Sequence, residues 1–390
     1  MSEIKVNSIK GVGASAAAIT VNNSDGTCTA NITNNLSNRR LTINGDMKIA
    51  QRGTSSTSSG YHTVDRFGVW NNGTDEVPTQ AQVDVAAGTT PYTLGFRKAL
   101  KITNGNQTSG AGAGDYIWIQ HVLEAQDIAN SGWNYTSSSS YVTLSFWVKS
   151  SVPQEFKFYV RTQDGTNKSY AMTTGSLSTD TWTKITKTIP GHSDLQFDSD
   201  NGAGFEINIP PFMGTDRTSN SVTENAWKTW NSGERFPDMT STWYTTNDAT
   251  FEITGVQLEV SDHASDFQFR SFAEELALCQ RYYQVIAEGT NKAICNAVSF
   301  AGNDGFGFID LKSVMRAAPT LDVVTGTGYW RAFRNAGVGD FNDVIMESNS
   351  NRTVGLKFQG VSSGTSLSTG QVGFIRTNNS AAFLAASSEL

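Results

Sequence analysis

Aromatic residues crowd one polar stretch of this 390-residue chain, residues 225–248. The stretch lacks strand alternation, so a regular core face does not account for all of its rings. Flat rings stack on the apolar faces of sugars, and Asn, Asp and Glu beside them accept hydrogen bonds from sugar hydroxyls. The composition therefore predicts glycan contact, through Trp227, Trp230, Trp243 and Tyr244. The alternative is a loop that folds back and buries its rings as a satellite core.

Residues that would carry catalysis are sparse. The four histidines are His62, His121, His192 and His263, and none has the spacing that places two imidazoles on one metal. No nucleophile-elbow, phosphate-loop or C-x-x-C motif occurs. With 36 Asp and Glu, a glycosidase carboxylate pair could always be nominated, without specificity. We expect no enzymatic activity and no cofactor.

One segment, residues 194–202, gathers the oxygen ligands that Ca²⁺ prefers. It departs from the EF-hand pattern, because its glycine falls one position early and no glutamate stands at the twelfth position. We expect a solvated turn, with a calcium site as the alternative.

Composition favours a turn-rich β protein with a neutral, polar surface. Charged residues make up only 17% of the chain, which has 36 glycines and a formal charge of −7. No Lys/Arg run occurs, so nucleic acid is not expected as a partner. Three cysteines, Cys28, Cys279 and Cys295, cannot all pair and are expected to be reduced thiols. There is no signal-peptide core and no 18-residue apolar run, so we expect no secretion and no membrane insertion.

The strands that must position the aromatic residues recur from residue 41 to 268. Apolar side chains at Val142, Leu144 and Phe146 alternate with polar ones, as a half-buried antiparallel strand requires. At Gly255 the apolar phase slips by one residue, which predicts a β-bulge. We expect an all-β chain with an antiparallel jelly-roll or β-sandwich body over 41–268, of the kind that binds carbohydrate.

A single strong helix signal follows, and we assign a linking helix to residues 269–289. Ser271 and Glu274 have the spacing of a capping box. Four apolar residues then form one stripe, and Gly289 is expected to end the helix at about Glu288. The stripe consists of Phe272, Leu276, Cys279 and Tyr283.

The two ends of the chain differ in kind. Residues 1–40 contain apolar islands too short to fold alone, and we expect an attachment arm that orders against a partner. Residues 290–390 are expected to form a smaller C-terminal β domain. Its final apolar run, 381–386, is either an ordinary last strand or one completed by a neighbouring subunit.

Three segments carry a family resemblance: "LTINGDMKIAQRGTS…YHTVDRF", "ITGVQLEV…FQFRSFAEELALCQRYYQ" and "MRAAPTL". In order and spacing they resemble tail-fibre and related virion proteins of tailed phages, particularly marine ones. Within the first segment, Arg52 and Arg66 are expected to pair with Asp46 and Asp65 for structural reasons. The resemblance implies a homotrimer whose N-terminal arm binds other tail or virion proteins.

The function expected is that of a tail-fibre type virion protein that attaches to a glycan of the host cell surface. It would be made in the host cytoplasm, reside in the virion tail, and act by binding. One alternative is a purely structural virion protein, a head fibre or a tail scaffold component, without receptor binding. The other is a spike depolymerase.

Overall fold

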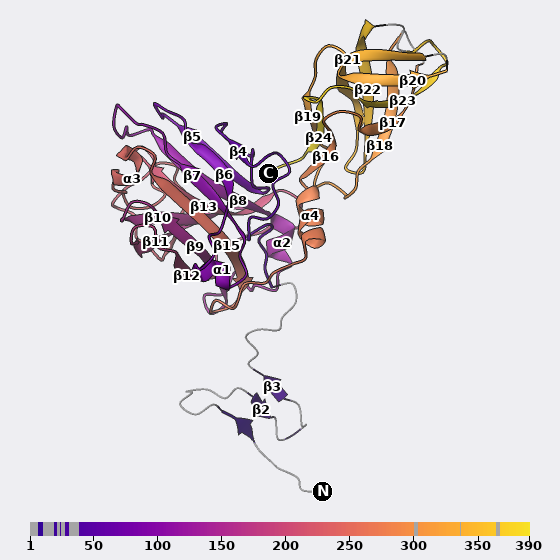
Figure 1. Cartoon of the computed structure of the whole chain (residues 1–390). Helices are drawn as coiled ribbons and strands as arrows, with labels where there is room; N and C mark the ends of the chain where they lie inside the picture. The colour runs from indigo at the N-terminus through magenta and orange to yellow at the C-terminus, as the bar shows by residue number, and fades with distance from the viewer. Residues whose placement is uncertain are drawn as a thin grey trace.

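The computed structural model describes residues 7–10, 19–21, 24, 28–30, 39–299, 303–335, 337–363 and 367–390. Most of the expected attachment arm, 1–40, lies outside these residues. Within it, three short strands form an antiparallel sheet, which Figure 1 shows set apart from the rest of the chain. They are β1 (Ser8–Ile9), β2 (Ile19–Val21) and β3 (Cys28–Ala30).

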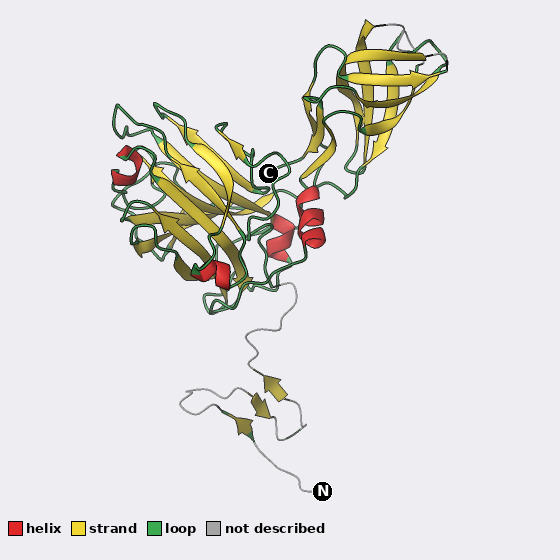
Figure 2. Ribbon diagram, viewed as in Figure 1, coloured by secondary structure: helices red, strands yellow, loops and turns green. Residues whose placement is uncertain are grey.

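The body is an antiparallel β-sandwich of two six-stranded sheets, as the sequence predicts (Figures 1 and 2). One sheet, here the front sheet, has the order β14 (Trp227–Thr229), β11 (Lys168–Ser176), β10 (Glu155–Thr162), β13 (Ala203–Met213), β8 (Tyr116–Glu124), β5 (Phe67–Asn72). The other, here the back sheet, has the order β12 (Thr183–Pro190), β9 (Tyr141–Ser150), β15 (Thr250–Val260), β7 (Lys98–Thr103), β6 (Thr79–Asp84), β4 (Ser55–Ser56).

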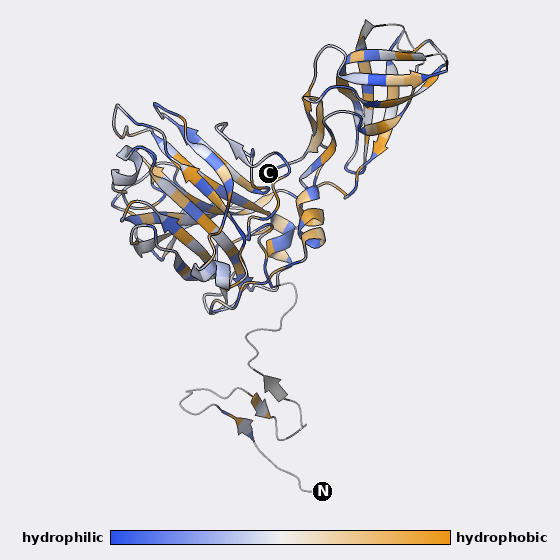
Figure 3. Ribbon diagram, in the orientation of Figure 1, coloured by the Kyte–Doolittle hydropathy of each residue, from blue (hydrophilic) through white to orange (hydrophobic). Residues whose placement is uncertain are grey.

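The core of the sandwich lies between the two sheets. Val142, Leu144 and Phe146 of β9 are all buried, as their alternation predicts. Phe146 meets Phe158 of β10 edge to face, with ring centroids 5.2 Å apart. Figure 3 shows polar and apolar residues interspersed along these strands, which fits strands with one face in the core and one outside.

The predicted β-bulge in β15 is present. The register with β9 slips between Thr254 and Gln257, and Gly255 has a φ of 66°, which costs little without a Cβ. The bulge lets the Val256 amide donate to the carbonyl of Gly45 at 2.9 Å. A Cβ on Gly45 would lie 2.0 Å from the Val256 oxygen, so this approach also requires glycine.

Three short helices, α1 (Thr90–Thr93), α2 (Ala125–Ala129) and α3 (Thr242–Thr245), lie within the body, and α4 (Phe272–Gln280) follows it. The capping box predicted for α4 is present, because Ser271 Oγ accepts from the Glu274 amide and the Glu274 carboxylate accepts from the Ser271 amide. The predicted extension to Glu288 is wrong. The helix ends at Gln280, and residues 283–288 form strand β16 (Tyr283–Glu288).

The buried face of α4 also differs from the predicted stripe. Glu275 and Cys279 are buried, whereas Phe272 is 62% exposed. The cause is an ion pair between Glu275 and the buried Arg40, which turns the carboxylate inward. The helix therefore docks through a charge as well as through apolar contact.

The C-terminal region is all-β, as predicted. β16, β24 (Phe383–Ser387) and β19 (Thr320–Val324) form a three-stranded sheet, so the final apolar run pairs within its own chain. The other strands close a barrel around Trp330, Phe341 and Phe358. Its order is β17 (Ala293–Val298), β18 (Gly305–Asp310), β22 (Thr353–Ser363), β21 (Gly337–Asn349), β20 (Trp330–Arg334), β23 (Val372–Thr377).

The two arginines of the family-like motif lie where the C-terminal region meets the body. Arg52 Nη1 lies 3.9 Å from Asp65 Oδ1, as expected, and both Arg52 and Arg66 pair with Glu389. Asp46 instead pairs with Lys48, at 3.0 Å, so its expected pairing with Arg52 or Arg66 is wrong. Arg52 and Arg66 of the motif therefore bind Glu389, near the end of the chain, to the body.

Two further observations concern the whole chain. None of the helices in the described residues has the length and apolar character needed to cross a membrane. Cys279 and Cys295 are free thiols.

Candidate functional site

The outer face of the front sheet carries an ordered set of polar and aromatic side chains. In β8, Ile117 and Ile119 face the core, so Trp118 and Gln120 face outward. Strand pairing places Gln120 opposite Asn208 of β13. The sheet thus holds these side chains in fixed positions on one face.

Three cross-strand rows organise this outer face. In the first, Arg161 of β10 lies between Ser169 of β11 and Glu206 of β13. The second runs through Tyr159, Asn208, Gln120 and Gly68. The third pairs Trp118 with Trp70 of β5.

Hydrogen bonds join the polar members of these rows. Trp70 Nε1 donates to Gln120 Oε1 at 3.1 Å, and Gln120 Nε2 donates to Asn208 Oδ1 at 3.4 Å. Asn208 Nδ2 then donates to Glu206 Oε2 at 3.3 Å. The amides and the carboxylate are thus held in one orientation, the preorganisation that a binding face needs.

The close packing around Gly68 leaves no room for a side chain at this position. A Cβ on it would lie 2.9 Å from Trp70 Nε1 and 3.3 Å from a ring carbon of Tyr61. Its absence lets the Trp70 indole lie across the end of the second row. Trp70 and Tyr61 meet edge to face, with centroids 6.1 Å apart.

The loop after β14 brings Trp230 onto the same face. Its ring stacks on Tyr159, with centroids 5.6 Å apart and an interplanar angle of 22°. The guanidinium of Arg161 lies 4.4 Å from the Trp230 ring centroid. Trp230 and Trp118 therefore flank the polar rows, and both are only partly buried.

In the described structure, four polar atoms on this face and at its edge are buried without a hydrogen-bond partner: Trp118 Nε1, Arg161 Nε, Ser169 Oγ and Arg217 Nε. Unpaired buried polar groups are rare, and each calls for a partner. Ordered water would supply such partners.

The four residues predicted from the sequence fall into two groups. Trp230 is part of this face, and Trp227 lies at its edge on β14, half-buried, where Nε1 donates to the Pro190 carbonyl at 2.7 Å. Trp243 and Tyr244 are fully buried between the sheets. Their expected exposure is wrong, and the alternative of a buried loop holds for them.

The sequence does not single out four residues of this face: Trp118, Trp70, Gln120 and Asn208. The alternation of residues 116–120 was visible as a strand, but which side faced outward depends on the partner sheet. Trp118 also stacks on Tyr116, with centroids 4.6 Å apart, which extends the aromatic surface along β8.

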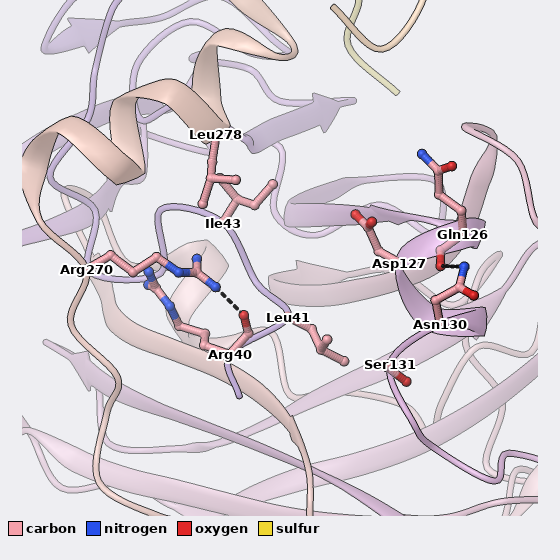
Figure 4. Close-up of a pocket in the computed structure, with 9 residues that line it drawn as sticks. All are labelled: Arg40, Leu41, Ile43, Gln126, Asp127, Asn130, Ser131, Arg270 and Leu278. Carbon is pink, nitrogen blue, oxygen red and sulfur yellow. Dashed lines mark hydrogen bonds between the residues drawn. The ribbon is translucent and has the colours of Figure 1, made fainter. Parts of the chain in front are cut away.

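Two hollows lie outside this face, and neither combines aromatic rings with an amide row. The first, of about 460 Å³, lies between residues 40–43, α2 and the flanks of α4 (Figure 4). In the described structure its lining includes one carboxylate, Asp127, and no aromatic ring. Asn130 Nδ2 donates to the Gln126 carbonyl at 2.8 Å, and an Arg270 guanidinium nitrogen donates to the Arg40 carbonyl. Two of the polar side chains that line this hollow are therefore already hydrogen-bonded within the chain.

The second hollow, of about 220 Å³, lies on the outer side of the back sheet. Phe96, Phe267 and Phe269 pack against one another there, with centroids 4.9 to 5.1 Å apart. It lacks the amide row of the front sheet.

The predicted turn at residues 194–202 uses its carboxylates locally. The Gly202 amide donates to Asp200 Oδ1 at 2.9 Å, and Gln196 Nε2 donates to Asp198 Oδ1 at 3.1 Å. Across the described ranges, no group of three His, Cys, Asp or Glu side chains is placed to hold a metal ion.

No protein-family model and no curated protein sequence matches this chain. Similar solved structures include the enzymatically active domain of tailspike protein 4 from Bacteriophage CBA120, with 10% identity, a TM-score of 0.30, and coverage of 57% of this chain but 21% of that one. The N-terminal cellulose-binding domain of Cellulomonas fimi beta-1,4-glucanase C has 10% identity, a TM-score of 0.27, and coverage of 55% and 98%. The xylan-binding domain of Paenibacillus barcinonensis Xyn10C has 13% identity, a TM-score of 0.26, and coverage of 54% and 94%. Because the identities and TM-scores are this low, we draw no conclusion about function from these similarities.

Proposed function

We propose that this protein binds glycan on the outer face of the front sheet and serves as a tail-fibre type attachment protein of a phage virion. The observation that carries the binding proposal is the partly exposed Gln120, flanked by Trp118 and Trp230 and fixed by hydrogen bonds to the side chains behind it. Two of these, Asn208 and Glu206, are buried. Rings provide apolar contact for sugar faces, and the Gln120 amide, fixed in orientation by its buried neighbours, provides a partner for hydroxyls. The virion assignment rests on the sequence resemblance.

Binding, without chemical change of the glycan, is the proposed mode of action. A shallow sheet face makes few contacts per site, so affinity for a surface gains from several sites acting together. We therefore also propose a homotrimer, with the N-terminal arm holding the fibre to other virion proteins. Simultaneous engagement would strengthen adsorption without any new contact.

The test is binding of the full chain to a panel of immobilised polysaccharides, with Gln120→Ala and Trp118→Ala as variants. Each is expected to weaken binding by about 0.5 to 2 kcal/mol, the range for single polar and aromatic contacts. Trp182→Ala is the matched control, because Trp182 is a partly buried tryptophan associated with the back sheet. Equal binding by all four proteins would overturn this assignment of the site.

The same assay separates the two alternatives. A purely structural virion protein would bind no member of the panel and no host cell. A depolymerase would release reducing ends from a bound polysaccharide over time, which a binding protein does not.

A further inference from the structure

Two arginines are held side by side at one edge of the outer face. Arg217 follows β13, and Arg235 lies in the loop after β14. The Arg235 amide donates to the Arg217 carbonyl at 3.0 Å, and the Ser219 amide donates to the Phe236 carbonyl at 3.0 Å. These bonds join the two segments as a short ladder, so the positions of the two arginines are linked.

Both guanidinium groups lie against the aromatic surface. Arg217 Cζ is 4.5 Å from the Tyr116 ring centroid. Arg235 Cζ is 5.0 Å from that of Trp118 and 5.3 Å from that of Trp230. Arg235 therefore lies between the two indoles that flank the polar rows, and a ligand spanning these rings would meet its charge.

Neither arginine has a carboxylate partner. Among the described residues, no Asp or Glu oxygen lies within 4.0 Å of the guanidinium nitrogens of Arg217 or Arg235. Neighbouring cations differ, since Arg161 Nη1 lies 3.9 Å from Glu206 and Lys228 Nζ lies 2.8 Å from Glu234. The face thus keeps two positive charges without a direct ion pair in a chain whose formal charge is −7.

Burial makes this arrangement costly for Arg235, which is only 7% exposed. Its Nη1 donates to the Tyr159 hydroxyl at 3.2 Å, and its Nε donates to the Ser232 carbonyl at 3.3 Å. Burial raises the pKa of Tyr159, so this hydroxyl stays neutral and does not balance the charge. A buried cation without a counter-charge is destabilising, and cation–π contact offsets only part of that cost.

We propose that the outer face of the front sheet selects acidic glycans, whose carboxylate or sulfate groups contact Arg217 and Arg235. Guanidinium groups match both anions, because their planar N–H pairs bind two oxygens at once. This inference rests on the proposed glycan binding and adds the class of sugar. The neutral Gln120 amide would then bind hydroxyls of the same glycan.

The experiment compares the full chain on alginate, which carries carboxylates, on dextran sulfate, which carries sulfates, and on neutral dextran. Binding to at least one acidic polymer is expected to exceed binding to dextran tenfold or more, and to weaken as salt rises from about 50 to 500 mM. Arg217→Gln and Arg235→Gln should each weaken acidic-polymer binding about tenfold, the equivalent of one charge-assisted hydrogen bond. Which acidic polymer responds distinguishes carboxylate from sulfate recognition.

Lys98→Gln is the matched control, because it removes one positive charge from the back sheet, where Lys98 pairs with Asp84. It should leave binding unchanged. If Arg235→Gln lowers stability, the more exposed Arg217 still tests the idea. Equal binding to dextran and the acidic polymers, or the same loss in Lys98→Gln as in Arg217→Gln, would overturn the acidic-glycan inference and leave glycan binding standing. If the unmodified chain binds neither these polymers nor any member of the wider panel, the acidic-glycan inference and the proposed glycan binding are both overturned.

Discussion

Trp243 and Trp118 are the same residue type in opposite roles. Trp243 has 0% exposure, and its Nε1 donates to the Thr250 carbonyl at 3.0 Å. Trp243→Ala should therefore lower the free energy of unfolding by about 3 to 5 kcal/mol, because it leaves a large cavity. Binding by the molecules that remain folded should not change. Denaturant unfolding and polysaccharide binding, measured on the same preparations, check both expectations.

Trp118→Ala should show the reverse pattern, with the larger effect on binding and the smaller one on stability. A Trp118 variant that loses several kcal/mol of stability and binds normally would place this ring with the core residues. The pair of variants thus separates a packing role from a contact role at single residues.

His121 gives a pH-dependent expectation. Its ring stacks on Phe67, Nδ1 lies 3.0 Å from the Arg66 carbonyl, and Nε2 lies 3.4 Å from the Ile43 amide. Nδ1 therefore donates and Nε2 accepts, which fits a neutral imidazole. Burial, with the nearby Arg66 charge, lowers its pKa from 6.5 to about 3. Because the folded pKa is depressed, this stabilising contribution is present above pH 6.5 and is lost as pH falls toward 3.

The test compares the unmodified chain with His121→Phe, which keeps the ring stack but does not titrate. The variant should be less stable at pH 7.5, where it lacks both hydrogen bonds. Below pH 6.5 the gap should narrow, by up to about 1.4 kcal/mol per pH unit. A gap that stays constant down to pH 4 would mean that His121 titrates normally in the folded chain.

The aromatic loop shows what residue types alone can predict. Its composition identified Trp230, which does lie on the outer face, but it did not separate that ring from Trp243. The separation depends on α3, a four-residue helix that turns Trp243 and Tyr244 into the core. So short a helix has no periodic signal, because it spans barely one turn.

At the scale of elements, α4 is attached through a buried charge. Glu275 pairs with the buried Arg40 and also accepts the Asn44 amide at 2.6 Å. Glu275→Gln should lower the free energy of unfolding by about 3 to 5 kcal/mol, because it leaves the Arg40 charge buried without its partner. Thermal and denaturant unfolding measure the loss.

Glu274→Gln is the matched control for that prediction, being the same change at the neighbouring exposed position. It keeps the capping box and should cost about 0.3 to 1 kcal/mol, through loss of one negative charge at the start of the helix. A double variant, Arg40→Met with Glu275→Leu, should lose less than the two single changes combined, because the two charges of the pair are removed together. The residual loss includes the contact of Glu275 with Arg270, at 3.4 Å. Equal effects of Glu274→Gln and Glu275→Gln would refute the buried pairing.

The ends of α4 show why some element boundaries are readable and others are not. The capping box is local, four residues long, and it correctly predicts the start. The end depends on β24, more than a hundred residues later, whose Ser387 pairs with Tyr283. This distant pairing converts the expected last turns of helix into a strand. The bulge at Gly255 was predictable because the alternation and the glycine lie in the same short segment.

For the whole molecule, the last residues of the chain hold the C-terminal region to the body. Glu389 pairs with Arg52 at 3.0 Å and with the buried Arg66, whose guanidinium lies 3.4 Å from the Tyr282 ring centroid. Glu389→Gln should lower the melting temperature and speed proteolysis between the two regions, because it leaves Arg66 without its counter-charge. Glu288→Gln, at an exposed position, is the control. Unchanged melting and proteolysis in Glu389→Gln would show that other contacts suffice.

The last prediction concerns the proposed homotrimer and the surface beside α4. Phe272 is 62% and Phe269 45% exposed, an apolar surface beside the point where the arm joins the body, since Arg39 Nη2 donates to the Asp266 carbonyl at 2.7 Å. We propose that these two exposed rings are covered in the trimer. Light scattering at micromolar concentration should give three times the 42.1 kDa chain mass.

Phe272→Asp should shift the mass to one chain, because a charge is costly to bury in an apolar interface. Phe308→Asp, the same change at a 73% exposed barrel position, should leave the trimer intact. A stable monomer or dimer of the unmodified chain would refute the trimer, and equal dissociation by both variants would move the contact away from α4.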